Sequence, residues 1–319
     1  MSAGAKVVVV GSLSLDMVFQ VPRRPLKGET VKGFSFETFV GGKGNNQALA
    51  AARAGASTAM VGKVGKDSYG ELILETLEKN GVDISAMSTD PEAGSGLANI
   101  YVDPDGDNSI IIVPRANDRL LPADIDRARP LLEKAGLLVL QLEIPMQTVI
   151  HAAELAAELD LKVLLNPAPA PDDGELPEAL YKKLDYLIPN ESEAGLLLQR
   201  NIDGVDAALA AARQLKKRMK PGAVVLITLG EKGVAGIGPD DEELIVAAYN
   251  VDSVDTTAAG DAFAGCLARG LTEGLSLKDA VREACAAGAL ATTKPGAVPS
   301  LPTRVEILSL VQAGSGKNT

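Results

Sequence analysis

Short, continuous runs of Val, Leu and Ile recur along this chain and alternate with longer alanine-rich stretches that have a helical period. The expected strands are Lys6–Val10, Ala59–Val64, Leu137–Leu142, Lys162–Leu165, Tyr186–Pro189 and Val224–Leu229. The expected helices are Asn45–Ala54, Tyr69–Asn80, Met146–Leu159, Gly204–Arg218, Ala262–Thr272 and Leu277–Thr292. Strands that are apolar throughout are typical of sheets covered on both faces. The alternation therefore predicts an α/β fold with a mostly parallel central sheet flanked by helices on both faces.

Two stretches interrupt this alternation. Residues 17–40 alternate apolar and polar side chains without a helical period, and residues 96–113 form two strand-like runs around a turn. We expect the two to pair into a small β-sheet lid over the carboxyl edge of the main sheet, where ligands bind in open α/β folds. Ordinary β-decoration of the surface is the alternative. Residues 1–16, 41–95 and 114–319 would then form the α/β domain that binds nucleotide and substrate.

Composition excludes several classes of protein. Because 42 acidic residues outnumber 31 basic ones, the chain lacks the basic face of a nucleic-acid-binding protein. One histidine, His151, and two cysteines, Cys266 and Cys285, argue against a His-based triad, a disulfide framework and a four-ligand zinc site. No uncharged apolar run reaches the roughly 18 residues of a membrane span, and the first strand follows Met1 closely without a secretion-signal pattern. We expect a cytoplasmic protein that binds neither nucleic acid nor membrane.

A glycine-rich segment, Gly41-Gly42-Lys43-Gly44-Asn45-Asn46-Gln47, leads into the first expected helix. Glycines at this point let the backbone approach a ligand closely, and the start of a helix offers free N–H groups. Lys43 and Asn46 add polar side chains at the same place. The segment does not match GxGxxG, because Gln47 stands at the third glycine position. A tight turn without a ligand is the alternative.

The segment Val254-Asp255-Thr256-Thr257-Ala258-Ala259-Gly260-Asp261-Ala262-Phe263 opens another helix. The small residues Ala258, Ala259 and Gly260 expose successive backbone amides at its N-terminus, which is a suitable place for an anion. A carboxylate in the same turn, that of Asp261, suggests a chemical task such as accepting a proton from an attacking hydroxyl. The alternative is that Asp261 only complements the helix dipole.

Three further groups of polar residues follow strands. Glu143 follows Leu137–Leu142, where it could contact a ligand or cap a helix. Asn190 and Glu193 follow Tyr186–Pro189 and suit hydrated Mg²⁺, although their spacing also fits a capping box. The turn Thr228–Gly233 follows Val224–Leu229 and could admit a nucleotide or close a hairpin. All of these groups end on the same expected edge of the sheet.

These segments together resemble the ribokinase-like carbohydrate kinase family, from Val7 to about Pro302. The N-terminal signature resembles residues 41–48, and the C-terminal signature resembles residues 255–263. Between them, Gln141-Leu142-Glu143, Asn166-Pro167-Ala168-Pro169-Ala170 and Asn190-Glu191-Ser192-Glu193 stand at the spacing of the family. Five ordered motifs over nearly the whole chain make this resemblance specific.

The resemblance implies ATP-dependent phosphorylation of the 5-hydroxyl of ribose. It implies that Asp261 is the catalytic base and that the amides of Ala258, Ala259 and Gly260 form an anion hole. The implied sugar-binding residues are Ser14, Asp16, Gly42, Lys43, Asn46, Glu143 and Asp261. The implied nucleotide-binding residues are Asn190, Thr228, Gly230, Gly233 and Gly260. Mg²⁺ would be organised through water and phosphate by Asn190 and Glu193.

The resemblance also implies activation by K⁺ or a similar monovalent cation, and a homodimer formed through the lid. The positions that match the cation site are Asp255, Thr257, Ala291, Lys294, Gly296 and Ser300, several of them through backbone carbonyls.

Two departures concern the identity of the sugar. Ser14 stands where many members have an Asn that touches the sugar, and Pro114-Arg115 precedes Ala116-Asn117 where Gly-Ala-Asn is usual. A kinase for 2-deoxyribose, fructose or adenosine is therefore an alternative. A non-catalytic sugar- or nucleotide-binding regulator is a second one, against which the presence of Asp261 speaks. A dinucleotide-dependent dehydrogenase is excluded, because Gly11-Ser12-Leu13-Ser14 replaces the GxGxxG that such a protein needs after its first strand.

Overall fold

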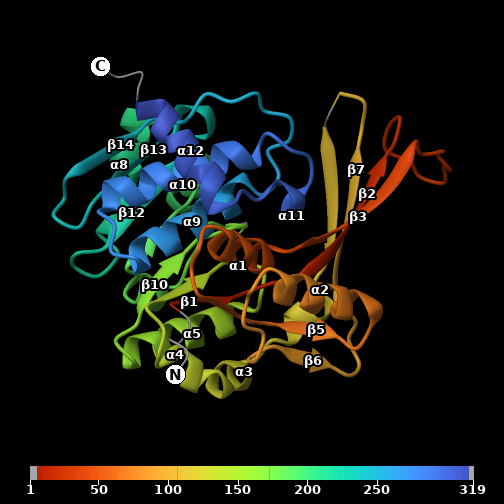
Figure 1. Ribbon diagram of the computed structural model, residues 1–319, viewed down its shortest axis with the longest axis horizontal. Coiled ribbons are helices and arrows are strands. Elements are labelled where there is room, and N and C mark those ends of the chain that lie inside the picture. Colours follow the sequence, from red (N-terminus) through yellow and green to blue (C-terminus); the bar gives the residue numbers. More distant parts are fainter. Residues whose placement is uncertain (1–5, 106, 172, 316–319) are drawn as a thin grey trace.

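The computed structural model describes residues 6–105, 107–171 and 173–315, and its centre is an eight-stranded sheet (Figure 1). The strand order is β14-β13-β12-β11-β10-β9-β1-β4, and the strands from β12 to β4 are parallel. Their bounds are β1 Val7–Val10, β4 Thr58–Val61, β9 Leu137–Leu140, β10 Lys162–Leu165, β11 Tyr186–Leu187, β12 Val224–Thr228, β13 Val234–Ile237 and β14 Glu243–Val246. The prediction of a mostly parallel sheet is confirmed.

Helices cover both faces of this sheet, which is also as predicted. Alternate residues of β1 show the two layers, because Val8 and Val10 pack into one apolar cluster while Val7 and Val9 pack into the other. The first cluster includes residues of α3 Pro122–Arg127, α4 Arg129–Leu132, α5 Met146–Glu158, α6 Glu178–Tyr181, α7 Glu191–Leu198 and α8 Gly204–Lys216. The second includes residues of α1 Lys43–Arg53, α2 Ser68–Lys79, α9 Ala259–Thr272, α10 Leu277–Ala291 and α12 Arg304–Ser315. Three short helices, η1 Arg115–Arg119, η2 Gly230–Lys232 and α11 Ala297–Ser300, complete the helical elements described.

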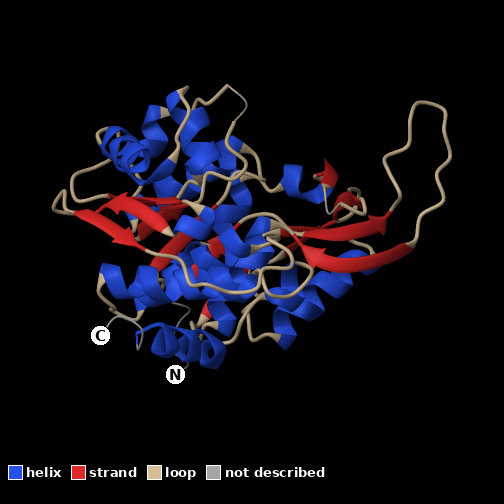
Figure 2. Ribbon diagram, turned by 90° about the horizontal axis from the view of Figure 1, so that it is seen from above, coloured by secondary structure: helices blue, strands red, loops and turns tan. Residues whose placement is uncertain are grey.

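A second sheet, which we call the lid sheet, projects from one side of the molecule (Figure 2). Its strands lie in the order β3-β2-β7-β8 and are β2 Ser14–Gln20, β3 Ser35–Gly41, β7 Gly96–Val102 and β8 Asn108–Val113. The central pair, β2 and β7, is parallel, and the two outer pairs are antiparallel. The two segments that interrupt the α/β pattern in sequence therefore lie side by side in space.

The expected strand Ala59–Val64 is wrong as a single element, because the chain forms two strands there. β4 pairs with β1 as far as Val61, opposite Val10, where β1 itself ends. Past Gly62 the chain forms β5 Lys63–Gly65, which pairs with β6 Ser88–Asp90 in a separate two-stranded sheet. The antiparallel strands β13 and β14 were not among the expected strands, although a hairpin after Val224–Leu229 was one interpretation of the turn that follows it. Both strands are only four residues long.

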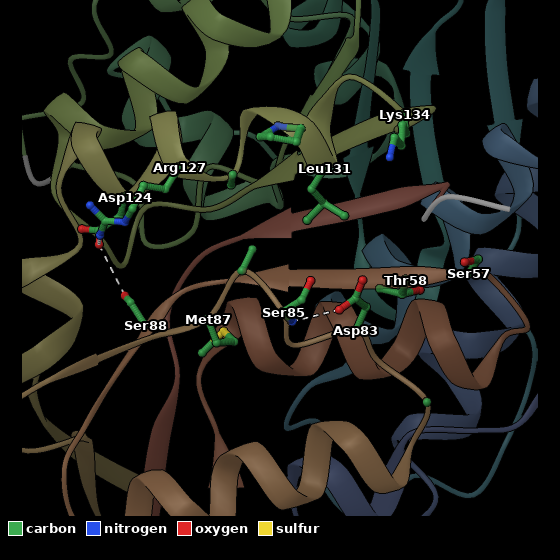
Figure 3. Close-up of a pocket in the computed structure, with 14 residues that line it drawn as sticks. Ser57, Thr58, Asp83, Ser85, Met87, Ser88, Asp124, Arg127, Leu131 and Lys134 are labelled. Atoms are coloured by element: carbon green, nitrogen blue, oxygen red, sulfur yellow. Dashed lines mark hydrogen bonds and ion pairs between the residues drawn. The ribbon is translucent and has the colours of Figure 1, made fainter. Parts of the chain in front are cut away.

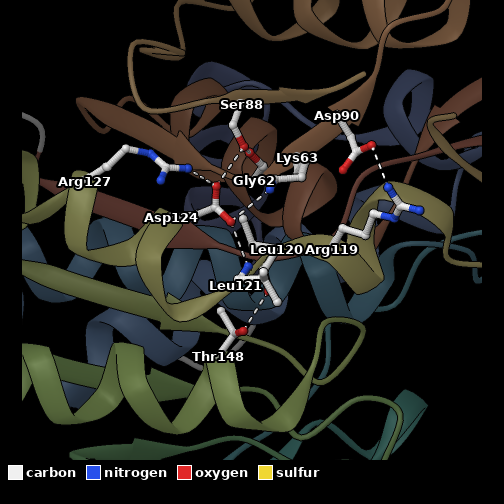
Figure 4. Close-up of polar contacts among 10 residues, drawn as sticks. All are labelled: Gly62, Lys63, Ser88, Asp90, Arg119, Leu120, Leu121, Asp124, Arg127 and Thr148. Atoms are coloured by element: carbon white, nitrogen blue, oxygen red, sulfur yellow. Dashed lines mark hydrogen bonds and ion pairs between the residues drawn. The ribbon is translucent and has the colours of Figure 1, made fainter. Parts of the chain in front are cut away.

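A buried carboxylate joins α3 to the β5–β6 sheet (Figure 4). Asp124 is 5% exposed and accepts from the backbone N–H of Leu121, which caps α3 (2.7 Å). Its other contacts are an ion pair with Lys63 (3.0 Å), a long hydrogen bond from Ser88 (3.4 Å) and an ion pair with Arg127. The Lys63 side chain is only 13% exposed, so charge on this carboxylate is neutralised inside the protein.

Candidate active site

The glycine-rich segment brings α1 against the turn between β1 and β2. Gly42 precedes α1 with φ +91°, and a Cβ there would lie 2.7 Å from the Cα of Leu13. Only glycine fits this approach. The backbone N–H of Asn45 then donates to the carbonyl of Ser12 (2.9 Å), which fixes the start of α1 above the end of β1.

Two carboxylates from different strands lie beside this helix start. Glu143, which follows β9, accepts from the Ser12 hydroxyl (2.6 Å) and from the backbone N–H of Lys43 (3.1 Å). Asp16, on β2, accepts from the Ser14 hydroxyl (2.7 Å). The carboxyl ends of parallel strands meet at one edge of a sheet, which explains why residues so far apart in sequence gather here.

Asp261 lies in the first turn of α9 and is 6% exposed. Its Oδ2 accepts from Asn46 Nδ2 (3.0 Å), and its Oδ1 accepts from Gln47 Nε2 (2.9 Å). The N-cap residue of α9, Ala258, has φ +59°, which is an uncommon backbone conformation for a residue with a Cβ. The chain therefore turns sharply just before the start of α9. The N–H of Ala259 donates back to the carbonyl of Thr256 in a long hydrogen bond (3.3 Å), while the N–H of Gly260 has no intrahelical acceptor, as is usual in a first turn.

The charges at this edge shift one another's pKa values. The pKa of Asp16 is raised to about 6. Burial is the main cause and the charges of Glu143 and Asp261 add to it, while the hydrogen bond from Ser14 opposes it. Burial also raises the pKa of Asp261, although Lys43 and the amides of Asn46 and Gln47 oppose this effect. Burial lowers the pKa of Lys43, but the surrounding carboxylates outweigh it and the net shift is upward. The site is a group of acids around the Lys43 ammonium, of which Asp261 is buried and Asp16 and Glu143 are partly exposed.

Asn190 and Glu193 form a capping box at the start of α7, so this reading of the motif is confirmed. The Asn190 side chain accepts from the N–H of Glu193 (2.8 Å), and Glu193 accepts from the N–H of Asn190 (2.9 Å). Burial raises the pKa of Glu193, against hydrogen bonding from Asn190 and the charge of Lys43. The other carboxylate oxygen of Glu193 and the side-chain NH₂ group of Asn190 take no part in the capping box, so each can make another contact.

The turn after β12 closes a hairpin. Thr228 pairs with Val234 of β13, and Gly230 and Gly233 both have positive φ, at +55° and +96°. Thr228 also forms a parallel bridge with Asn190, so these two predicted nucleotide-binding residues are neighbours.

Asp255 links the segment before α9 to the loop after α10. Its Oδ1 accepts from the N–H of Thr257 (2.9 Å), and its Oδ2 accepts from the N–H of Gly296 (2.8 Å). Although burial raises the pKa of Asp255, these hydrogen bonds bring it below its usual value. The other predicted cation-site side chains make different contacts, since Ser300 donates to the carbonyl of Ala297 (2.7 Å) and Lys294 pairs with Glu306 (3.1 Å).

Four further residues belong to this edge of the sheet without having been assigned a role from the sequence. Ser12 anchors Glu143, and Gln47 contacts Asp261. Gln141 donates to Gln47 (2.8 Å), and Gln47 in turn donates to Asn166 (3.1 Å). Gln47, Gln141 and Asn166 all stand inside motifs quoted above, so the signal was present in the residue types and their positions beside the assigned ones.

Two surface cavities lie away from this group. One, of about 600 Å³, lies between β4 and helices α3 and α4, with Asp83, Arg127 and Lys134 among its lining residues (Figure 3). The other lies along α7 and includes Asp173 and Arg200. In the described part of the chain, no three His, Cys, Asp or Glu side chains gather as a metal site would require. None of the described helices is long and apolar enough to cross a bilayer.

Comparison with known proteins identifies this arrangement. Residues 5–304 match the model of the pfkB family carbohydrate kinases. The chain belongs to this family. A pfkB carbohydrate kinase is a phosphotransferase whose acceptor is an alcohol group, so the chain is an enzyme of this class.

Several relatives of the pfkB family are similar over nearly their whole length. A ribokinase of Bacillus subtilis (strain 168) is 39% identical over 305 residues, which cover 96% of this chain and 99% of the relative. A deoxyribokinase of Salmonella typhi is 37% identical over 297 residues, which cover 93% and 95%. The solved structure of Arabidopsis thaliana ribokinase complexed with ribose and ATP has a TM-score of 0.88 and 32% identity, and the match covers 97% of this chain and 99% of that one.

Proposed function

We propose that this enzyme transfers the terminal phosphoryl group of ATP to the 5-hydroxyl of D-ribose. The observation that carries the proposal is the position of Asp261, a buried carboxylate held by Asn46 in the first turn of a helix whose N-terminal amides precede it. Similarity to ribokinases over nearly the whole chain supports ribose as the acceptor.

In this reaction the sugar lies at the carboxyl edge of the main sheet. Asp16, Lys43 and Glu143 hold its hydroxyls together with Asn46, because a polyhydroxylated ligand needs several converging donors and acceptors. The backbone of Gly42 and the hydroxyl of Ser14 border the same space.

Asp261 accepts the proton of the attacking hydroxyl as the oxygen–phosphorus bond forms. A positioned base of this kind typically contributes about 10²–10⁴-fold to the rate. The amides of Ala258, Ala259 and Gly260 neutralise charge on the transferring phosphoryl group, as backbone N–H groups at a helix start can do. The Ala259 amide exchanges its long hydrogen bond to the carbonyl of Thr256 (3.3 Å) for one to the phosphoryl oxygen.

ATP occupies the neighbouring region, where Asn190, Thr228, Gly230 and Gly233 line its pocket. The remaining oxygen of Glu193 and the amide group of Asn190 suit a Mg²⁺ ion held through water and phosphate, which fits the absence of a protein-only metal cluster in the described residues. When bound, this ion would supply charge neutralisation to the phosphates.

A monovalent cation such as K⁺ would bind beside the anion hole. Asp255 and Thr257, with the backbone at Ala291, Lys294, Gly296 and Ser300, would supply oxygen ligands, which suit K⁺. The hydrogen bond between Asp255 and Gly296 supports this proposal, because it brings two segments of the predicted set together.

The division of the chain into a lid and an α/β domain, a cytoplasmic location and a homodimer through the lid sheet belong to the same proposal. The lid would comprise residues 17–40 and 96–113. It would close over the sugar from the side of β2, the strand that carries Asp16.

A second candidate acceptor is 2-deoxyribose. The Ser14 hydroxyl donates to Asp16, so it is already engaged by the protein, and a deoxyribokinase is among the similar relatives. Ribose remains the first choice because several ribokinases match equally well.

The test is a panel of pentoses, hexoses and nucleosides with ATP and Mg²⁺, with ADP release as the measurement. We expect robust turnover with ribose and little with adenosine or fructose. Turnover with 2-deoxyribose alone would move the assignment to the second candidate. Absence of turnover with every acceptor, while sugar or ATP binds, would favour a non-catalytic regulator.

A further inference from the structure

Two fully buried glutamines lie behind the predicted base. Gln47, on α1, is 0% exposed, and its Nε2 donates both to Asp261 Oδ1 (2.9 Å) and to Asn166 Oδ1 (3.1 Å). An amide nitrogen has two hydrogens, so these two acceptors use both of them. The Gln47 amide oxygen must therefore point the other way.

That oxygen accepts a hydrogen bond from Gln141. Its Nε2 donates to Gln47 Oε1 (2.8 Å), and the Gln141 side chain is also 0% exposed. If Gln141 were turned over, two oxygens would face each other and the hydrogen bond would be lost. The direction of each amide is thus fixed by the next one.

The end of this chain of amides that lies farthest from Asp261 carries an unsatisfied hydrogen-bond acceptor. Gln141 Oε1 is buried and has no hydrogen-bond partner among the described residues. It lies so close to Gly11 that a Cβ there would stand 1.9 Å away. A buried acceptor without a partner typically costs about 1–3 kcal/mol. A buried polar group without a partner in a folded protein needs a structural or functional explanation.

We propose that Gln141 and Gln47 form a directional pair, here called the glutamine pair, that positions Asp261 and presents only N–H groups to it. Gln47 and Gln141 are positioning residues, since they act on the acceptor hydroxyl only through Asp261. This inference rests on the proposed role of Asp261 as the base.

The physical effect of the glutamine pair is to hold Asp261 ionised in a buried place. Burial favours the neutral acid, whereas N–H donors favour the carboxylate. The charged groups that also face Asp261 come from four other positions, namely Lys43, Glu143, Asp16 and Glu193. Only the ionised form accepts a proton, so loss of a donor should raise the pKa of Asp261 and remove activity first at the acidic end of the pH profile.

Three variants, one at Gln47 and two at Gln141, test the pair. Gln47→Met removes the donor itself and keeps the length of the side chain. Gln141→Met removes the group that orients Gln47. Gln141→Glu places an acceptor opposite Gln47, so Gln47 gains by turning over and presenting its oxygen to Asp261. Thr148→Val is the matched control, because Thr148 is fully buried and donates to the carbonyl of Leu120 (2.7 Å), outside the glutamine pair.

The measurements are kcat and KM for ribose across pH, with unfolding midpoints for each variant. We expect Gln47→Met to lose about tenfold or more in kcat at the acidic end, since one hydrogen bond to a charged group is lost. Most of the loss should be recovered at the alkaline end, with KM for ribose changed by no more than about twofold. Gln141→Met should lose less than Gln141→Glu. A loss that is uniform across pH and follows stability, as in Thr148→Val, would overturn the proposal.

A second readout separates this inference from the proposed function. The Asp261 carboxyl can be titrated by NMR in protein with ¹³C-labelled aspartate, and its signal is assigned by its loss in Asp261→Asn. A higher pKa in Gln47→Met than in the wild type supports the glutamine pair even if ribose is not the acceptor. An unchanged pKa overturns it, even if ribose is phosphorylated.

Discussion

Asp261 accepts hydrogen bonds on both carboxylate oxygens, so Asp261→Asn turns one acceptor into a donor that faces another donor. As the base, Asp261 acts on the chemical step, and we expect kcat to fall by at least about a hundredfold. The Kd for ATP should change little, because in the proposed arrangement the nucleotide is held by Asn190, Thr228, Gly230 and Gly233 and not by Asp261. Steady-state kinetics and ATP titration check this. A dipole-complementing role would change stability by about 0.3–1 kcal/mol and leave kcat nearly normal.

A second prediction concerns Ser14 and the choice between ribose and 2-deoxyribose. Its hydroxyl donates to Asp16 (2.7 Å), so in the proposed sugar site we expect it to hold a sugar hydroxyl less well than a longer amide side chain would. We expect weak discrimination between ribose and 2-deoxyribose in the wild type. Ser14→Asn should raise the ratio of the two kcat/KM values by about tenfold, since a hydrogen bond in a buried site is typically worth about 1–3 kcal/mol. Ser14→Ala is the control, and equal ratios in the wild type and Ser14→Asn would refute the idea.

The sequence allowed the types of residue at this site to be predicted, but not their bonding. Glu143 and Asp261 could be picked out because both were expected at the ligand-binding edge of the sheet, although each could equally cap a helix or complement its dipole. The family resemblance decided between these roles, and it alone supplied Asp16. Ser12 and Gln141 could not be picked out, because a serine in a turn or a glutamine after a strand is equally at home in ordinary structure. Their meaning depends on partners more than ninety residues away in sequence, such as Gln47 for Gln141.

At the scale of elements, Asp124 joins α3 to the β5–β6 sheet through Lys63 and Arg127. Asp124→Ala leaves the mostly buried Lys63 ammonium without this partner, and breaking a buried pair typically costs about 3–5 kcal/mol. We expect a loss of this order in the free energy of unfolding, measured with urea, and a normal kcat in the folded enzyme. Adding Lys63→Met should recover part of the loss. A single-variant loss below about 1 kcal/mol would show that Asp124 carries little of the connection.

The loop held by Asp255 leads to a prediction about ions. A cation at this loop would order the segment that presents the amides of Ala258 to Gly260, so K⁺ should raise turnover over Na⁺ alone. Asp255→Asn should reduce this response, since it weakens both the negative charge and the bond to Gly296. Assays in buffers freed of contaminating K⁺ measure the effect. Equal activity in the two buffers would count against the cation site.

The elements themselves were predicted to different degrees. Helices α5 and α10 agree with expectation to within one residue, because their apolar period is long. α10 is also capped at its start, where the Ser276 side chain accepts from the N–H of Asp279. The break at Gly62 could not be read from the sequence, since Val61 and Val64 on either side of it both suit a strand and only the end of β1 decides where pairing stops. Local pattern sets the type of an element, and its neighbours set where it ends.

At the scale of the whole molecule, the lid sheet leaves much apolar surface uncovered. Four consecutive residues of β8, Ile110, Ile111, Ile112 and Val113, are between 47% and 56% exposed, and β8 is an edge strand. Exposed apolar edges favour association. We expect a homodimer through the lid sheet by light scattering at micromolar concentration, and a monomer for Ile112→Asp. A monomeric wild type under these conditions would count decisively against the dimer.

The register of strand β2 against its neighbours β3 and β7 decides which of its side chains face the main sheet's carboxyl edge. Ser14 and Asp16, near the start of β2, belong to the proposed sugar site, while Phe19 near its far end contacts the rings of Phe36 and Tyr101 at 4.8 and 5.8 Å between centroids. Side chains alternate between the two faces of a strand, so a slip of one residue would exchange the face of Asp16 for that of Leu15. The aromatic contacts in the lid oppose such a slip. Aromatic side chains remote from Glu143 and Asp261 thus help to decide whether a carboxylate or a leucine faces the proposed sugar site.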